Sequence, residues 1–285
     1  MAQSISSKNR ELYPNAPDWF YVNIEYPYED KYVNVSNCKI HYLFFQEQGN
    51  EKENLDKPGL IFIHGNGAHA HWYTFLAPFF VKDYNVVAIS NSGNGLSGWR
   101  DMYPFSLWAE EIYGVADDAG MLKRYPFNKP VVVAHSMGTI VAMALARLPA
   151  KIKHFSGFIL LDELPRPKGY FDNFEFFPVS TATRKPRTRH KVRDKSISVR
   201  SRFYLQPSQK VMNTYLVDWV ADHSIKFDDA RGSWTWSFDP SKYMKHPKHD
   251  SFPSNIMNYL SIESIKQIPV RISFIVGERS AICNP

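Results

Sequence analysis

The sequence predicts an α/β fold in which a mostly parallel sheet carries helices on both faces. Short apolar runs of strand length alternate with segments of helical periodicity between residues 59 and 161. Such alternation is typical of parallel strands joined by crossover helices. A segment with the pattern of a hairpin precedes them, so we expect the sheet to open with antiparallel strands. The 285 residues are enough for one large domain that carries an insertion.

The elements are predicted in the following order. Residues 1–30 show no periodicity and are expected to wrap the outside of the domain. Residues 32–45 predict two strands around a turn at Ser36 and Asn37. Further strands are predicted at 59–63, 84–90, 130–134, 155–161 and 269–277, and helices at 71–81, 105–124 and 136–148.

The alternation lapses between residues 163 and 267, where basic, proline-containing and aromatic stretches follow one another. We interpret this segment as a lid inserted into the sheet domain. The predicted organisation is therefore a first part of the core at 1–162, a lid at 163–267, and a core strand, the seventh, within 268–285.

The net charge of +6 is concentrated in one segment. Residues 184–202 hold nine Lys or Arg and a single acid, Asp194. The simpler interpretation is a solvated basic segment, and a patch for an anionic ligand is the alternative. Because no nucleic-acid-binding motif accompanies the segment, we expect no nucleic-acid partner.

No apolar stretch is long enough to span a bilayer, and the N-terminus lacks the apolar run of a secretory signal. We therefore expect a cytoplasmic protein without a membrane partner. Cys38 and Cys283 are too few for a disulfide framework or a cysteine-rich zinc site, and are expected to be ordinary thiols.

Ser136 is the candidate nucleophile. It ends the apolar run 131–135 and leads directly into a helical pattern, within the sequence VVVAHSMG. A serine on so sharp a corner exposes its hydroxyl and needs small residues two positions before and after it, which Ala134 and Gly138 supply. The alanine departs from the G-x-S-x-G pattern by one methyl group. The alternative interpretation is a serine that only caps the helix.

A glycine-bearing loop follows the earlier strand, in the sequence IFIHGNG at residues 61–67. Backbone N–H groups of such a loop can stabilise a developing oxyanion. We expect the N–H groups of Asn66 and Met137 to form the oxyanion hole. Taken alone, Asn66-Gly67 is an ordinary turn dipeptide.

These motifs, together with NGLSGWR at residues 94–100, GFILLD at 157–162, RFYLQP at 202–207 and WTWSFDP at 234–240, resemble the α/β-hydrolase family. The resemblance is to its lid-bearing serine branch, near C–C hydrolases, esterases and haloalkane dehalogenases. It implies hydrolysis of a small, largely apolar ester or carbonyl substrate, with no cofactor and no metal. Dehalogenases and epoxide hydrolases of this fold use an aspartate at the position of Ser136, so the resemblance disfavours both reactions.

The resemblance places the triad acid after strand six or strand seven. Ser280 occupies the usual acid position after strand seven, so Asp162 after strand six is favoured, while Glu163 and Glu278 remain alternatives. The resemblance also implies that the catalytic histidine follows an eighth strand, and none of the ten histidines occupies that place. We therefore expect either a C-terminally incomplete hydrolase, lacking its last strand, last helix and catalytic histidine, or a catalytically impaired member.

Two alternatives belong to other function classes. The chain could be an inactive binding or scaffold member of the fold. A metal hydrolase is the weaker alternative, since His64, His69 and His71 follow a strand and histidines so spaced can ligate zinc. The sequence identifies neither the substrate nor the oligomeric state.

Overall fold

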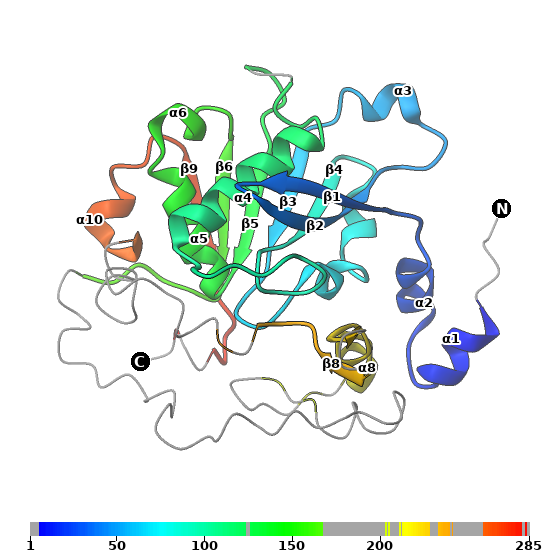
Figure 1. Ribbon diagram of the computed structural model, residues 1–285. Coiled ribbons are helices and arrows are strands. Elements are labelled where there is room, and N and C mark those ends of the chain that lie inside the picture. The colour runs from blue at the N-terminus through cyan, green and yellow to red at the C-terminus, as the bar shows by residue number, and fades with distance from the viewer. Residues whose placement is uncertain are drawn as a thin grey trace.

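The computed structural model describes residues 6–123, 126–167, 203, 205, 211, 213–228, 233–239, 241, 259–280 and 283. A central sheet lies between layers of helices, and α8 and β8 lie beyond one end of its strands (Figure 1). The basic segment 184–202 and the motif at 202–207, apart from residues 203 and 205, fall outside the described residues.

The sheet has seven strands in the order β1-β2-β4-β3-β5-β6-β9. The pairs β1–β2 and β2–β4 are antiparallel, and all the remaining pairs are parallel. This mostly parallel sheet confirms the predicted fold class. The strands are β1 (Glu29–Val35), β2 (Cys38–Phe45), β3 (Gly59–Ile63), β4 (Asn85–Ser90), β5 (Val131–His135), β6 (Gly157–Leu161) and β9 (Arg271–Ile275).

The hairpin β1–β2 forms where the sequence predicts it. Its two-residue turn has Ser36 at φ 48° and Asn37 at φ 60°. Positive φ at both central residues is the type I′ geometry, whose twist matches that of the flanking strands. The turn thereby starts the antiparallel edge of the sheet at the predicted position.

Each central strand is buried on both faces. In β3, Ile61 and Ile63 pack with α4 (Phe105–Asp118) and α5 (Met137–Ala146) on one face. Leu60 and Phe62 pack on the other face with the 3₁₀ turns η1 (Ala70–Tyr73) and η2 (Ala77–Phe80). Burial on both sides explains why these strands appear in the sequence as continuous apolar runs. Two single-turn helices, α3 (Glu51–Asn54) and α6 (Pro149–Ile152), complete this part.

One prediction of local structure was wrong. The predicted helix at 71–81 consists of the two separate 3₁₀ turns η1 and η2. Pro78 lies in the first turn of η2, where its missing N–H prevents a continuous helix from crossing it. The N-terminal residues, which show no periodicity in the sequence, contain α1 (Ser7–Leu12) and α2 (Asp18–Ile24).

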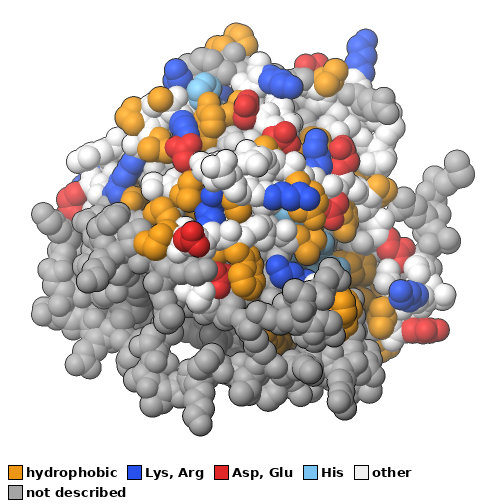
Figure 2. All heavy atoms as spheres, in the orientation of Figure 1, with side chains coloured by type: hydrophobic (Ala, Val, Ile, Leu, Met, Phe, Trp, Pro, Cys, Tyr) orange, Lys and Arg blue, Asp and Glu red, His pale blue; other side chains and the backbone are white. Residues whose placement is uncertain are grey.

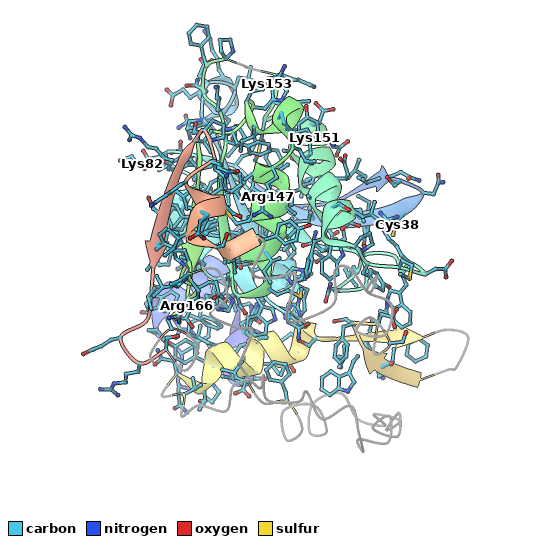
Figure 3. The ribbon with its side chains drawn as sticks, turned by 90° about the vertical axis from the view of Figure 1, so that its left-hand side faces the viewer. Cys38, Lys82, Arg147, Lys151, Lys153 and Arg166 are labelled. Carbon is cyan, nitrogen blue, oxygen red and sulfur yellow. The ribbon has the colours of Figure 1, made fainter. Side chains whose placement is uncertain are left out.

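Strands β6 and β9 are neighbours in the sheet although the residues from 162 to 270 separate them in sequence. The described part of that segment contains α8 (Thr214–His223), β7 (Ile225–Asp228), β8 (Ser233–Trp236) and α10 (Ile262–Ile265), with β7 and β8 forming their own antiparallel pair. Figure 3 shows α8 at the end of the sheet opposite Lys151 and Lys153. The Asp239 N–H donates to the Gly93 carbonyl (2.8 Å), so this segment contacts the loop after the carboxyl end of β4.

On the face seen in Figure 2, the acidic and basic side chains of the described residues are interspersed, and they form no large patch of a single charge. Among the described residues, no helix combines the length and the apolar character that a bilayer crossing requires. Cys38 and Cys283 are both buried free thiols.

Candidate active site

Ser136 lies on the corner between β5 and α5, with φ 51° and ψ −124°. A residue with a Cβ atom is strained at such a positive φ, and strain of this kind persists only where the surroundings impose it. Here the Ser136 N–H donates to the Leu161 carbonyl (3.2 Å), and the Ser136 carbonyl accepts from the Thr139 N–H (2.8 Å) and hydroxyl (2.6 Å). The backbone of the corner is thus fixed by β6 on one side and by α5 on the other.

Gly138 explains why the corner requires a small residue after the serine. An ideal Cβ at Gly138 would lie 2.7 Å from the His64 carbonyl oxygen and 2.9 Å from that of Ile63. The first turn of α5 therefore packs directly on the backbone of β3. No side chain fits between these two main-chain segments.

The glycine-bearing loop after β3 lies against the serine. An ideal Cβ at Gly65 would be 3.2 Å from Ser136 Cβ and 3.0 Å from His135 Nδ1. Asn66 is the next residue and is exposed. Met137 is the first residue of α5, so its N–H has no acceptor within the helix. The structure thus brings Ser136 together with the loop that carries Asn66.

His64 holds this loop in place. Its buried ring accepts a hydrogen bond at Nε2 from the Asn91 N–H (3.1 Å). Because Nε2 is an acceptor, the ring proton lies on Nδ1, which donates to the Gly65 carbonyl (2.7 Å). The neutral imidazole therefore links the loop after β4 to the loop beside the serine.

A buried ion pair supports the loop after β4, and sequence reasoning missed it. Arg100 Nη2 lies 3.0 Å from Glu111 Oε1 on α4. The other carboxylate oxygen accepts from the N–H of Ser92 (2.8 Å) and the side-chain amide of Asn91 (3.2 Å). Burial raises the pKa of Glu111, while the hydrogen bonds from Ser92 and the charge of Arg100 oppose that rise. The sequence does contain a signal for this ion pair, because Glu111 lies on the apolar face of the predicted helix at 105–124.

Asp162 follows β6 with φ 56° and stands at a strand end adjacent to that of Ser136, because His135 and Leu161 are register partners. Its N–H donates to the Ile275 carbonyl (2.8 Å), and its Oδ1 accepts from the Gly277 N–H (3.2 Å). The carboxyl group is thereby fixed between β6 and the end of β9.

The alternative acids differ in their surroundings. Burial raises the pKa of Glu163 to about 7. The hydrogen bond from the Leu164 N–H and the charge of Arg166 oppose this rise. Glu278 is exposed. Ser280 is buried, and its hydroxyl oxygen accepts from the Cys283 N–H (3.0 Å).

Seven of the ten histidines belong to the described residues, and His190, His246 and His249 do not. The Ser136 hydroxyl makes no hydrogen bond to any described residue. Burial lowers the pKa of His135, and the charge of Asp162 opposes that shift. Within the described ranges, no three His, Cys, Asp or Glu side chains are arranged to hold a metal ion, so the zinc alternative draws no support from the positions of His64, His69 and His71.

The strained serine corner, the glycine-bearing loop and the order of the strands define the class of protein. A profile of the alpha/beta hydrolase family matches residues 60–281. Because this match covers more than half of the sequence, the chain belongs to the alpha/beta hydrolase family.

Relatives and solved structures agree with this assignment. The chain is 24% identical over 162 residues to a Haemophilus influenzae protein named as an esterase/lipase, covering 55% of this chain and 52% of that protein. It is 25% identical over 149 residues to Epoxide hydrolase 1 of Caenorhabditis elegans, and this match covers 52% of this chain and 33% of that protein. The chain thus spans about half or less of the length of these relatives. The thioesterase domain from the curacin biosynthetic pathway has a similar fold, with a TM-score of 0.61 at 20% identity over 91% of this chain and 86% of that domain.

Proposed function

We propose that the protein is a serine hydrolase that acts on a small, largely apolar ester or carbonyl substrate. Ser136 Oγ attacks the carbonyl carbon, and the N–H groups of Asn66 and Met137 stabilise the oxyanion that forms. Asp162 orients the histidine that takes the hydroxyl proton. The observation that carries this proposal is the strained conformation of Ser136 beside the backbone of Gly65.

The proposal requires a general base, because a serine hydroxyl alone is a weak nucleophile. The described histidines make no hydrogen bond to the hydroxyl, so we assign this role to a histidine outside the described residues. Asp162 supports this arrangement, since it follows the strand next to that of Ser136 and its carboxyl group accepts a hydrogen bond from the Gly277 N–H.

The identity of the corner residue selects among the reactions of the relatives. An epoxide hydrolase is among them. The resemblance found in the sequence implies an aspartate nucleophile for epoxide hydrolysis, whereas this chain has Ser136. Acyl transfer to serine, or cleavage of a C–C bond next to a carbonyl group, fits this residue better.

We further propose that residues 163–267 act as a lid that admits the substrate. The support is the position of α8 and of the β7–β8 pair against the loops that follow β3 and β4. The Trp219 indole N–H donates to Thr74 Oγ1 (2.7 Å), and the Asp239 N–H donates to the Gly93 carbonyl. Loops at the carboxyl ends of parallel strands are where ligands bind in such sheets.

A fluorophosphonate probe tests the proposal on the full-length gene product. We expect covalent labelling that peptide mass spectrometry locates at Ser136, and hydrolysis of p-nitrophenyl butyrate that falls on the order of a thousandfold or more in Ser136→Ala. Ser106→Ala is the matched control, because Ser106 is an exposed serine on α4, and it should keep both signals.

Labelling elsewhere, or none at Ser136, would contradict the proposed chemistry. A folded protein that is not labelled but still binds apolar esters would belong to the binding class instead. Equal hydrolysis by Ser136→Ala and the unsubstituted protein would remove Ser136 from the reaction.

A further inference from the structure

Four histidine rings from three separate segments pack together beneath α8. His71 of η1 is at the centre, and we call His41, His69, His71 and His223 the histidine cluster. The His71 ring stacks on that of His223 with centroids 4.8 Å apart and on that of His41 at 5.6 Å, and His69 meets it edge-on at 5.7 Å. His41, His69 and His71 are buried.

The cluster is part of the contact that holds α8. His223 is the last residue of α8, and its Nδ1–H donates to the Trp219 carbonyl (2.8 Å), with the Trp219 ring 4.1 Å away. Apolar packing holds the same helix, since Tyr215, Trp219 and Val220 share a buried cluster with Tyr13 and the residues of α2. The helix is therefore docked by an apolar contact and by a contact that can take up protons.

Hydrogen bonding fixes His69 as a neutral ring. The Ser224 hydroxyl donates its proton to the Val220 carbonyl (2.7 Å), so its oxygen accepts from His69 Nε2–H (3.0 Å). His69 Nδ1 is then the unprotonated nitrogen, and it is buried without a hydrogen-bond partner in the described part of the chain. A second proton, on Nδ1, would give this buried ring a positive charge and an N–H donor without an acceptor. Both effects are strongly unfavourable.

The described groups with a printed contact to the cluster provide little compensating charge. Asp30 of β1 lies 3.1 Å from His41 Nε2, but its side chain is 46% exposed. Asp222 of α8 accepts a hydrogen bond from the Tyr13 hydroxyl (2.8 Å). The aromatic neighbours are Tyr32, 5.2 Å from the His41 ring, and Tyr28, 6.5 Å from the His71 ring, and His64 adds a further imidazole beside His69.

The direction of the pH effect follows from these surroundings. Burial lowers the pKa of His69 and of His71 well below the usual value, and the neighbouring imidazoles lower it further. Burial also lowers the pKa of His41 to about 4, although Asp30 opposes it. A hydrated imidazole has a pKa of about 6.5, so opening the cluster takes up protons below that pH. Docking is therefore fully stabilised above about pH 6.5 and weakens as the pH falls toward 4.

We propose that the histidine cluster is a pH-sensitive latch that holds α8 against η1 at neutral pH and releases it in mildly acidic solution. The latch lies outside the proposed nucleophile and oxyanion hole, and it does not depend on whether Ser136 reacts. A role of the latch in access to the carboxyl end of the sheet rests on the proposed lid.

Hydrogen exchange measured by mass spectrometry tests the latch on the whole protein between pH 7.5 and 5.0, after correction for intrinsic exchange rates. We expect the protection of peptides from α8 to fall by up to about tenfold per pH unit for each imidazole that takes up a proton. Peptides from β5 should remain more protected than those from α8 at each pH, because the release is local.

Three variants separate the latch from general loss of stability. His71→Phe/His223→Phe keeps the ring stack but removes the titration of His71, so it should weaken the pH dependence of α8 protection, of which His41 and His69 still supply a part. His71→Phe alone should also reduce the pH dependence if the double variant does not fold. His154→Gln, whose ring contacts Tyr113 on α4, should behave like the unsubstituted protein. Constant protection of α8 across the pH range would overturn the proposal. An equally steep fall in the double variant, or protection of α8 that equals that of β5 at every pH, would overturn it as well.

Discussion

The serine corner and the histidine cluster both lie at the carboxyl end of the sheet, but different forces hold them. The corner is fixed by main-chain contacts, with Gly138 against the carbonyl oxygens of Ile63 and His64 and Gly65 against Ser136. The cluster is fixed by stacked, ionisable rings. We therefore expect the corner to tolerate a change of pH but no added atoms, and the cluster to tolerate apolar rings of the same shape but no added protons.

The largest expected effect is at the corner. In Gly138→Ala the new Cβ would lie 2.7 Å from a backbone oxygen, so β3 or α5 must move. We expect the free energy of unfolding, measured in urea, to fall by about 3 kcal/mol. Gly277→Ala is the matched control, because the nearest atom to its Cβ would be 3.6 Å away, and it should change stability by less than about 0.5 kcal/mol. Equal losses in the two variants would mean that α5 does not pack on β3 as closely as described.

The second effect is at the cluster. Since the folded state lowers the pKa of His41, His69 and His71, the unfolded chain binds more protons below about pH 6.5. We expect the free energy of unfolding to fall between pH 7 and pH 5 by roughly 1.4 kcal/mol per pH unit for each such proton. His71→Phe should reduce this slope, whereas Gly138→Ala should lower stability equally at both pH values. A slope that Gly138→Ala changes as much as His71→Phe would show that the two regions are not independent.

The difference between the regions also explains what the sequence could predict. Strands β3, β4, β5 and β6 were predictable because burial on both faces leaves a continuous apolar run. The positions of Ser136, Asn66, Met137 and Asp162 at the ends of these strands followed from local motifs. Their chemical roles remain proposals.

The parts that depend on distant partners were not predictable. Helix α2 and the turn before it bury Phe20 and Tyr13 against α8, some two hundred residues away in sequence, so no local periodicity marks them. His41 and His223 belong to the same cluster but share no motif. Glu111 could be detected on the apolar face of the predicted helix, but its partner Arg100 is identified only once α4 lies beside the loop after β4.

The smallest expected effect tests whether the corner stores strain. Ser136→Gly removes the Cβ that makes φ 51° unfavourable, whereas Ser136→Ala keeps it. Relief of strain of roughly 1–3 kcal/mol, less the greater chain entropy of glycine at roughly 0.5–1 kcal/mol, should leave Ser136→Gly about 1 kcal/mol more stable than Ser136→Ala. In a thermal melt this corresponds to a rise in Tm of about 3 °C. If the two variants melt together, or if the alanine variant is the more stable, the backbone at Ser136 is not strained, and the geometric argument for a reactive hydroxyl at this corner loses its support.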